Sequence, residues 1–421
     1  MSGSVRRRVV VTGLGICAAN GASIAEFRSS LMRGVVGVRE ITDFDARGYR
    51  NSNAGVVKES MQGLRAEDEG LDRASILALR SAYEAMADSA LEIDDAVAHR
   101  TMVAVGTSLG GMHGHVRRMR RDFEAEPATR FDGPYDDILD LPPCQIANLL
   151  CHRFGARGGN STVVTACSAG SNSIAVALDW IRQDRADVVI ASATDPLCEL
   201  SFSGFNILMA LSPTASRPFD RDRDGLVVGE GGGTLILEDY EHAVKRGARI
   251  YAEITGYGLS NDAYHPTQPD PQAGGASRAI RRALEDAGIG PADVNYINAH
   301  GTATRYNDEM ELRAVTSVYG ELLASIPISS IKSMVGHTLG AAGTIEAIAT
   351  VLALADGFLP PTVNTTVPVE GYQYDFVPQA RTAAGLVNAC SHSFGFGGNA
   401  ACLVIARAPQ PDSAGAASAQ A

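Results

Sequence analysis

The sequence predicts an α/β protein built from two similar halves. Along the 421-residue chain, short apolar segments that suit β-strands alternate with segments of helical periodicity. A set of glycine-marked motifs also occurs twice, in the same order in each half. Alternating strands and helices are typical of sheets covered by helices, and a repeated order of motifs indicates an internal duplication.

The individual elements follow from local patterns. Runs of β-branched and other apolar residues mark the expected strands, which include Arg8–Thr12, Met102–Gly106, Val188–Ser192, Thr234–Glu238, Val294–Asn298 and Cys402–Ile405. Apolar spacings of three and four mark the expected helices, which include Ile76–Leu91, Ser171–Gln183, Ser277–Ala287 and Gly343–Leu354.

The repeat joins pairs of motifs: Val11–Gly15 with Ile254–Gly258, Gly106-Thr107 with Gly301-Thr302, and Cys167–Gly170 with His337–Gly340. It predicts a first half of residues 1–250 and a second half of residues 251–408. Cys167 and His337 are then expected at equivalent helix entrances. Residues 409–421 are rich in Ala, Ser, Gln and Pro and are expected to form a disordered tail.

Composition excludes several classes of protein. The net charge of −12 argues against a nucleic-acid partner, and no apolar run approaches the ~20 residues of a membrane-spanning helix. Arg6–Arg8 precedes an apolar stretch, but Thr12, Gly13 and Gly15 interrupt it too early for a signal peptide. The seven cysteines, an odd number without tight spacing, predict free thiols in a reducing cytoplasm. No Cys/His cluster has zinc spacing, so we expect no metal.

Cys167 is the candidate nucleophile. Thr162–Thr165 is expected as a strand, and Ser168-Ala169-Gly170 turns the chain into a helix. A thiol at a helix N-terminus meets the positive end of the helix dipole and unpaired N–H groups, which favour the thiolate. The other cysteines lack this context and are expected to be packing residues: Cys17, Cys144, Cys151, Cys198, Cys390 and Cys402.

Two histidines in glycine-marked turns could supply acid–base chemistry. His300 follows the expected strand Val294–Asn298, so its imidazole should emerge at a strand end, where sites are commonly built. His337 opens a helix and closely follows Lys332. An ammonium nearby would disfavour the protonated ring and leave a neutral imidazole that can donate a hydrogen bond. The alternative is three unrelated residues at strand ends.

Two other motifs suggest different enzymes. Gly13–Ala18 follows a strand and matches the dinucleotide fingerprint, yet its core recurs at Gly256–Gly258, which favours a turn required by the repeated fold. Gly106–Gly110 matches the nucleophile elbow of serine hydrolases. A second glycine at Gly111 and the lack of a clear apolar helix after it argue against that interpretation.

Together these motifs resemble the β-ketoacyl-[acyl carrier protein] synthases of the condensing-enzyme (thiolase-fold) superfamily. The similarity extends from about Arg7 to Arg407. It rests on Thr165–Gly170, His300–Thr304, Ile331–His337 and Ser393–Gly398. The resemblance implies two βαβαβαβ halves stacked as a five-layered αβαβα sandwich, and a dimer.

The resemblance also implies a decarboxylative condensation. Cys167 would accept an acyl group from a thioester on 4'-phosphopantetheine, with no other cofactor. His300 and His337 would hydrogen-bond the thioester oxygen of a malonyl carrier and stabilise the enolate as carbon dioxide leaves. The carbanion would attack the acyl-cysteine and give a 3-ketoacyl chain.

Further roles follow from the same resemblance. Lys332, paired with Glu311, would hold and tune the histidines. The backbone N–H groups of Cys167 and Phe396 would form the oxyanion hole, and Gly395–Gly398 would be a mobile gate. Residues expected to bind the acyl chain or the pantetheine arm are Thr302, Thr304, Leu109, Phe394, Gly395 and Gly397.

The implied partners are an acyl carrier protein and a second ketosynthase-fold chain. Arg217–Gly225 resembles the fatty-acid elongating enzymes. Four other segments resemble the ketosynthase subunits of bacterial type II polyketide synthases: Asp72–Ser75, Thr194–Pro196, Asn307-Asp308 and Ser329–His337. We favour the polyketide ketosynthase, in a homodimer or a heterodimer with a cysteine-less chain-length factor. The alternatives are a fatty-acid 3-oxoacyl-[acyl carrier protein] synthase II and a noncatalytic scaffold; because the chain keeps Cys167, we do not expect it to be the chain-length factor itself.

Two departures from the family pattern concern the gate and the docking surface. Asn399-Ala400 reverses the usual order after Gly398. The segment Arg65–Glu69 is mostly acidic where elongating synthases often carry basic residues for an acidic carrier. Docking is expected instead at Arg117, Arg118, Arg120 and Arg121, and a solvated helix face is the alternative.

Overall fold

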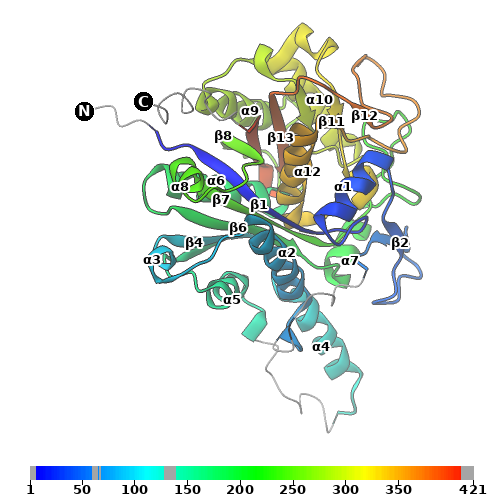
Figure 1. Cartoon of the computed structure of the whole chain (residues 1–421). Helices are drawn as coiled ribbons and strands as arrows, with labels where there is room; N and C mark the ends of the chain where they lie inside the picture. The colour runs from blue at the N-terminus through cyan, green and yellow to red at the C-terminus, as the bar shows by residue number, and fades with distance from the viewer. Residues whose placement is uncertain (1–5, 59–64, 66–67, 128–138, 409–421) are drawn as a thin grey trace, which may run out of the picture.

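A ten-stranded mixed sheet runs through both halves of the chain (Figure 1). The computed structural model describes residues 6–58, 65, 68–127 and 139–408, so the predicted tail 409–421 lies outside the described residues. The first half contributes β5 (Asn160–Val163), β4 (Thr101–Gly106), β6 (Val188–Asp195), β7 (Gly231–Asp239) and β1 (Val9–Cys17). The second half contributes β8 (Ala252–Asn261), β14 (Asn399–Arg407), β13 (Asn388–Gly395), β9 (Tyr296–Asn298) and β10 (Ile328–Ser329).

The strand order is the same when it is followed inward from either edge. It is β5-β4-β6-β7-β1 in one half and β10-β9-β13-β14-β8 in the other. The outer strand pairs are parallel and the inner ones antiparallel in both halves. β1 and β8 join the halves through two residue pairs, Val10 with Glu253 and Val11 with Ala252. This short seam lets the two five-stranded parts diverge and leaves space for helices between them.

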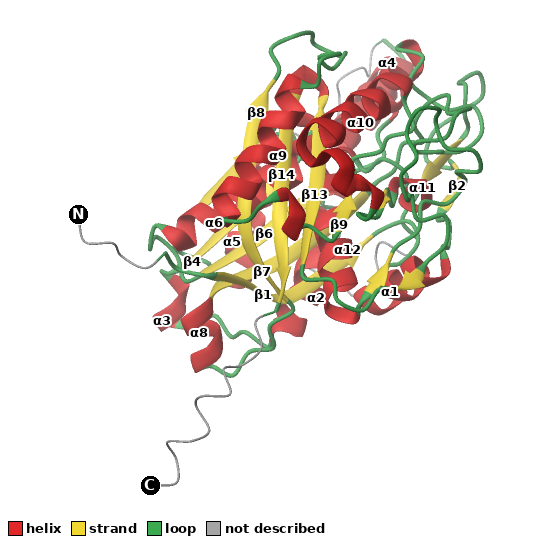
Figure 2. Ribbon diagram, turned by 90° about the horizontal axis from the view of Figure 1, so that it is seen from above, coloured by secondary structure: helices red, strands yellow, loops and turns green. Residues whose placement is uncertain are grey.

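Alternating side chains divide the protein into layers. In β4, Val103 and Val105 pack toward α2 (Arg73–Ser89) and α5 (Cys144–Phe154), whereas Met102 and Ala104 face the interior. In β14, Leu403 and Ile405 face the interior and Cys402 and Val404 pack toward two outer helices, α9 (Gly274–Ala287) and α10 (Arg305–Tyr319). Figure 2 shows these two helices over β8, β14 and β13. Strict alternation with apolar residues on both faces means that each half-sheet is covered on both sides.

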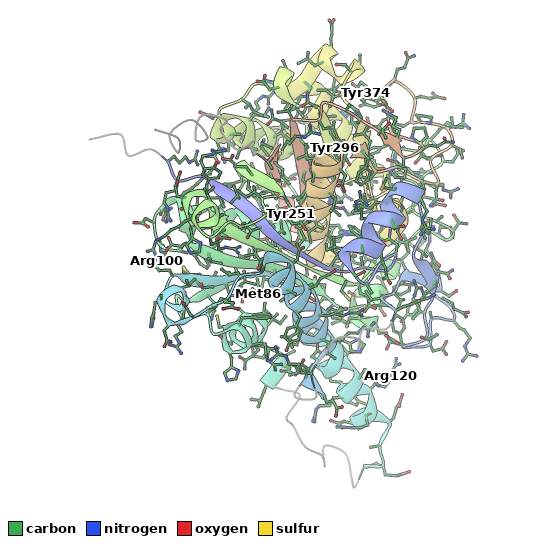
Figure 3. All side chains as sticks on the ribbon, in the orientation of Figure 1. Met86, Arg100, Arg120, Tyr251, Tyr296 and Tyr374 are labelled. Carbon is green, nitrogen blue, oxygen red and sulfur yellow. The ribbon has the colours of Figure 1, made fainter. Side chains whose placement is uncertain are left out.

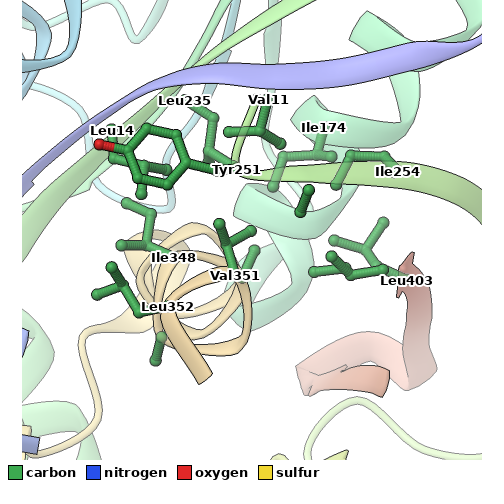
Figure 4. Close-up of a cluster of buried hydrophobic side chains, with 14 of the residues drawn as sticks. Val11, Leu14, Ile174, Leu235, Tyr251, Ile254, Ile348, Val351, Leu352 and Leu403 are labelled. Atoms are coloured by element: carbon green, nitrogen blue, oxygen red, sulfur yellow. The ribbon is translucent and has the colours of Figure 1, made fainter. Parts of the chain in front are cut away.

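The middle layer consists of α6 (Ala169–Arg182) and α12 (Ala342–Asp356). Side chains from both helices pack between the half-sheets in one hydrophobic core. Figure 4 shows this packing for Ile174 of α6, Ile348 and Val351 of α12, Val11 and Leu235 of the first half, and Ile254 and Leu403 of the second. The order helix, sheet, helix, sheet, helix confirms the predicted five-layered α/β architecture.

Shorter elements surround these layers. The remaining helices are α1 (Ile24–Arg33), α3 (Asp95–Ala98), α4 (Met112–Glu124), α7 (Glu199–Ile207), α8 (Tyr240–Lys245) and α11 (Lys332–Val335). Two small two-stranded antiparallel sheets pair β2 (Val38–Glu40) with β3 (Asn53–Gly55) and β11 (Phe358–Leu359) with β12 (Arg381–Thr382). Within the described residues, only Leu339–Asp356 is long and apolar enough to cross a membrane, and 89% of it is buried in the core. This segment contains the central helix α12.

The glycine motif at the start of each half is part of a strand, so the predicted turn is wrong. Gly13 and Gly15 lie inside β1, where a Cβ atom would overlap the backbone of α2 at Ala85 and Ser81. Gly256 and Gly258 do the same in β8 against α9. The glycines therefore allow a helix to approach the strand closely. A dinucleotide fingerprint needs a strand that turns into a helix N-terminus, and β1 continues to Cys17 instead.

Candidate active site

Cys167 lies in a tight turn between β5 and the central helix α6. Residues Ala166–Ser168 form one 3₁₀ turn, and Ala166 has a left-handed backbone with φ of 49°. A non-glycine residue in this region is strained and is held by its surroundings. Cys167 is buried, with 7% of the residue exposed. The turn thus places the sulfur at the N-terminal end of α6, as the sequence predicts.

The central helix of the second half begins in the same way, but its equivalent of Cys167 is Gly340. Leu339 is left-handed with φ of 53°, and a 3₁₀ turn from Leu339 to Ala341 leads into α12. The two helices meet symmetrically: a Cβ at Gly170 would lie 2.7 Å from the Thr344 nitrogen, and one at Gly343 would lie 2.5 Å from the Ser171 nitrogen. The predicted equivalence of Cys167 with His337 is therefore wrong by three positions, because matching Gly170 with Gly340 set the wrong register.

His337 nevertheless lies directly against the nucleophile. Its Nε2 atom is 3.1 Å from Cys167 Sγ. The preceding turn is fixed by hydrogen bonds to a neighbouring segment: the His337 N–H donates to the Val227 carbonyl, and the Gly229 N–H donates to the His337 carbonyl. Gly336 has φ of 77°, which only glycine adopts readily. The backbone thus aims the imidazole across the boundary between the halves.

His300 stands beside His337 and is held by Lys332. The two imidazole rings are 5.3 Å apart between centroids and nearly perpendicular. Lys332 Nζ is 3.0 Å from His300 Nδ1. Because an ammonium can only donate, His300 must carry its own proton on Nε2. The structure thus brings Cys167, His300, His337 and Lys332 into one cluster.

The partner of Lys332 is Glu346 of α12, so the predicted pairing with Glu311 is wrong. Lys332 Nζ forms a buried ion pair with the Glu346 carboxylate. Glu311 lies behind His300, where it accepts hydrogen bonds from the backbone N–H groups of His300 at 2.8 Å and Gly301 at 2.7 Å. Glu311 therefore fixes the turn that carries His300, and Glu346 compensates the lysine charge.

Burial sets the charge state of the cluster. It lowers the pKa of His300 and His337 well below the usual range, and the Lys332 charge lowers both further. A neutral His337 is what the sequence predicts. Burial also raises the pKa of the Cys167 thiol to about 11, although Lys332 and the backbone N–H groups of Phe396 and Cys167 oppose this rise. The expected resting thiolate is therefore wrong, because complete desolvation outweighs the helix terminus.

The backbone N–H groups of Cys167 and Phe396 are near the sulfur and lower its pKa. Gly395 allows the end of β13 to lie close to the Cys167 backbone, since a Cβ at this position would be 3.0 Å from the Cys167 nitrogen. The following loop is held from outside: the Gly397 N–H donates to the Pro266 carbonyl, and Asn399 Nδ2 donates to the Phe396 carbonyl at 2.9 Å. Asn399 thus keeps a role in the loop despite the reversed order.

A cavity of about 470 Å³ opens onto the cluster. The predicted binding residues that line it are Thr302, Thr304, Phe394, Gly395 and Gly397, together with Cys167, His300, His337 and Phe396. The hydroxyl groups of Thr302 and Thr304 are 2.9 Å apart. Leu109 does not line this cavity; its N–H donates to the Asp195 carboxylate at 2.8 Å. Asp195 also accepts from the Gly340 N–H and so links the turn after β4 to the entrance of α12.

The ligand atoms of Cys167, His300 and His337 lie within 4.8 Å of one another, a set that could hold a metal ion. Zinc takes such nitrogen and sulfur ligands only when they are deprotonated. The lysine bond to His300 Nδ1 places the proton on Nε2, which removes the lone pair that faces the cavity. The geometry thus favours hydrogen-bond donation over metal binding.

Ser108, the candidate hydrolase nucleophile, lacks a base. Its buried Oγ has no hydrogen-bond partner among the described residues. A helix does follow, α4, but it is polar and exposes Arg117, Arg120 and Arg121. A serine hydrolase needs a histidine within hydrogen-bond reach of the serine, so this interpretation has no support.

Sequence reasoning missed two buried residues of the cluster. Glu346 lies on a helix that was predicted, but its one-turn position beyond Gly343 did not reveal a lysine partner. His392, adjacent to the Ser393–Gly398 motif, is fully buried, with its Nδ1 atom 3.1 Å from Glu311 Oε1. The available signal was a histidine that alternates with Cys390 and Phe394 on the face of β13 that packs toward α10.

Comparison with known families agrees with this geometry. The model of the β-ketoacyl synthase N-terminal domain matches residues 6–243, and that of the C-terminal domain matches residues 251–366. The chain belongs to the β-ketoacyl synthase family. It is therefore an acyltransferase of the condensing-enzyme class.

Relatives of this synthase come from two metabolic settings. It is 41% identical over 420 residues to 3-oxoacyl-[acyl-carrier-protein] synthase 2 of Synechocystis sp. (strain ATCC 27184 / PCC 6803 / Kazusa), covering 96% of this chain and 99% of the relative. The ishigamide ketosynthase/chain length factor is 35% identical with a TM-score of 0.89, covering 96% and 100%. The chain is also similar to a structure of a type II polyketide synthase acyl-carrier protein in complex with its ketosynthase bound to the hexaketide. The sequence identity is 35% and the TM-score is 0.88, covering 96% of this chain and 100% of that chain.

Proposed function

We propose that the synthase catalyses decarboxylative condensation of a Cys167-bound acyl group with a malonyl-[acyl carrier protein], as the ketosynthase of a bacterial type II polyketide synthase. The observation that carries the reaction is the contact between Cys167 Sγ and His337 Nε2, with His300 beside it. A buried thiol and two neutral imidazoles match the needs of both acyl transfer and enolate formation.

Acylation begins from the thiol form of Cys167. His337 Nε2 accepts the thiol proton as Sγ attacks the thioester carbonyl, and the bond from that carbonyl to the carrier sulfur breaks. The N–H groups of Cys167 and Phe396 stabilise the oxyanion. The carrier leaves as a thiol with the proton, and the acyl group stays on Cys167.

Condensation then uses the donor that Lys332 creates. His300 offers Nε2–H to the thioester oxygen of the malonyl unit, since Lys332 occupies its Nδ1 atom. Carbon dioxide leaves, and the resulting enolate attacks the acyl carbonyl on Cys167. A carbon–carbon bond forms, and the bond from the acyl carbon to Cys167 Sγ breaks. The released thiolate then takes a proton from solvent. Because both histidines are neutral, neither protonates the enolate before it attacks.

The proposed carrier would reach Cys167 through the mouth of the cavity. Arg50 and Arg305 line it beside the apolar side chains of Leu208 and Met209. This combination suits an anionic phosphopantetheine arm and a carrier surface. The arginines of α4 fit docking less well, since none lines this cavity, Arg118 is buried and Arg120 pairs with Glu199. Figure 3 labels Arg120 on α4.

A heterodimer with a cysteine-less chain-length factor belongs to this proposal, as does a cytoplasmic location. The support is the likeness to the ishigamide ketosynthase/chain length factor and to the ketosynthase bound to the hexaketide. The second candidate is fatty-acid elongation by a homodimer. It is favoured by the 41% identity to 3-oxoacyl-[acyl-carrier-protein] synthase 2.

The reaction is tested by intact-mass analysis of the protein after incubation with acyl-[acyl carrier protein]. The native chain should gain the acyl mass and release carbon dioxide from malonyl-[acyl carrier protein]. Cys167→Ala should gain no acyl mass. Persistent acylation of that variant, or no decarboxylation by the native chain, would overturn the proposal; the latter result would favour a noncatalytic scaffold.

The pathway is tested by coexpression with a cysteine-less homologue from neighbouring genes. Copurification in a one-to-one complex that extends a chain without reduction of the ketone supports the polyketide role. A homodimer that elongates saturated acyl carriers just as fast without the homologue would instead support fatty-acid synthesis.

A further inference from the structure

His392 is a buried histidine that the proposed reaction does not use directly. It lies on β13, and its side chain is fully buried. Its Nδ1 atom is 3.1 Å from Glu311 Oε1, and that carboxylate is only 1% exposed. Removing a carboxylate from water is costly unless an opposite charge and hydrogen bonds compensate it. His392 is therefore in position to supply that charge.

Glu311 connects His392 to the catalytic loop. One of its oxygens accepts from the His300 N–H and the other from the Gly301 N–H, at 2.8 and 2.7 Å. The oxygen that bonds His300 is also the one that contacts His392. A second connection is made by Phe394, whose ring centroid is 5.6 Å from that of His392 and 6.0 Å from that of His300. A single residue, either Glu311 or Phe394, thus lies between His392 and His300.

The surroundings of His392 hold it in its charged form. Burial opposes protonation, but the neighbouring Cys390 and Glu311 outweigh it and raise the pKa of His392 to about 9. The hydrogen bond that the structure shows is the one from Nδ1 to Glu311; Nε2 has no hydrogen-bond partner among the described residues. The polar groups near it come from every element around it: Cys390 of β13, Cys402 of β14, Glu311 and Tyr319 of α10, Glu346 of α12, and His300. Among these, Glu311 and Glu346 are acidic. Cys402, His392 and Tyr319 lower the pKa of the Cys390 thiol to about 5, although burial opposes this. The charge on His392 in turn lowers the pKa of His300.

We propose that His392 is a positioning residue that remains protonated, forms a buried ion pair with Glu311, and so fixes the His300–Gly301 backbone while keeping His300 neutral. Two buried cations then flank the catalytic histidine: Lys332 at its Nδ1 atom and His392 behind its backbone. Each has its own carboxylate, Glu346 and Glu311 respectively. The catalytic consequence rests on the proposed condensation, whereas the ion pair does not.

The proposal predicts a specific change in pH dependence. Removing the positive charge but keeping a donor to Glu311 leaves a buried carboxylate uncompensated near His300. The pKa of His300 should then rise, because a cation is lost and an anion remains. Protonated His300 no longer accepts the Lys332 hydrogen bond, so the variant should lose activity on acidification at a higher pH than the native chain does. We expect this acid limb to move up by about one pH unit.

The first experiment measures decarboxylation of malonyl-[acyl carrier protein] against pH. His392→Asn keeps an amide donor near the position of Nδ1 and should raise the acid limb. His392→Asn combined with Glu311→Gln removes both charges and should return the limb toward its native position at a lower rate. His152→Asn, an exposed histidine on α5, is the control. A lower rate with an unchanged acid limb in His392→Asn would mean a merely structural role and would overturn the proposal.

The second experiment does not depend on activity. In protein labelled with ¹³C at histidine Cε1, NMR should show His392 protonated at pH 7.5 in the native chain. Its signal is the one lost in His392→Asn or, should that variant not fold, in His392→Gln. A neutral His392 at pH 7.5 would overturn the ion pair. If the native chain failed to decarboxylate malonyl-[acyl carrier protein], the proposed function would fall while this titration still decided the state of His392.

Discussion

The entrances of the two central helices have the same backbone but opposite chemical roles. In each, a left-handed residue opens a 3₁₀ turn that leads into a buried helix, at Ala166 and at Leu339. The second residue of the turn is Cys167 in one half and Gly340 in the other. At Gly340 a Cβ would lie 2.6 Å from the Ser108 nitrogen and 2.7 Å from Asp195 Oδ2. No side chain fits there without movement.

The difference shows how a duplicated fold divides its functions. The first half keeps a side chain at its turn and provides the nucleophile. The second half fills the equivalent space with the turn after β4, and provides the histidines and the lysine instead. The active site therefore forms only where the halves meet, and it needs the two entrances to differ. Four tests would break or sharpen this comparison.

The largest effect should come from the charged side of the second half. Lys332→Met removes the group that sets the His300 tautomer and leaves Glu346 without its partner. We expect malonyl decarboxylation to slow by at least about 10²-fold, measured as carbon dioxide release, together with a lower melting temperature.

A double variant separates the two consequences. Lys332→Met with Glu346→Gln should regain thermal stability, because the buried carboxylate is gone, but not the rate. Recovery of the rate as well would show that Lys332 serves only to neutralise Glu346.

The nucleophile of the first half should respond to pH as a buried thiol. Burial raises the pKa of Cys167 to about 11, so the thiolate fraction grows about tenfold per pH unit below that value. Alkylation of Cys167 by iodoacetamide, followed by peptide mass analysis, should accelerate steadily from pH 7 to pH 10. A plateau below pH 8 would instead support the thiolate that the helix entrance predicts. The exposed Cys144 reports reagent reactivity in the same samples.

The smallest effect is expected where the central helices α6 and α12 cross, and it tests whether their contact is symmetric. Gly170→Ala and Gly343→Ala each place a methyl group against the other central helix. Both should destabilise the fold by about 1–3 kcal/mol through overpacking, measured by urea denaturation. Similar losses are expected because the contacts are equivalent. Gly204→Ala, where no atom lies within 4 Å of the new Cβ, serves as the control. A neutral result at one of the two central positions would show that the crossing is not symmetric.

Much of the fold was predictable because its signals are local. The predicted segments around α2, α6, α9 and α12 are helices in the structure, within a few residues at each end. β1 extends to Cys17, beyond its predicted end, because glycine inside a strand looks like a turn until the packed helix is known. The helices α4 and α10 were not predicted, since both carry many polar residues and α10 buries Asp308 and Glu311.

The site was predictable in its membership but not in its pairings. Motif spacing and family resemblance named Cys167, His300, His337 and Lys332, and these residues lie together. Which carboxylate meets Lys332 depends on how α10 and α12 approach from opposite sides of the half-sheet, and no local pattern encodes that. The thiol state of Cys167 was missed for a related reason: helix-terminus chemistry is local, but desolvation depends on every surrounding layer.

The two-pair seam between β1 and β8 has a consequence for the precision of the site. Cys167 belongs to one side of the seam, and His337 to the other, yet their reactive atoms are 3.1 Å apart. The seam contributes few of the backbone bonds behind that spacing. The spacing is also held by the bonds of His337 to Val227 and Gly229 and by the interlocked helices α6 and α12. A substitution deep in the middle layer, far from any substrate, would thus change the distance between Cys167 Sγ and His337 Nε2. In this protein the packing of the core therefore also determines the geometry of the active site.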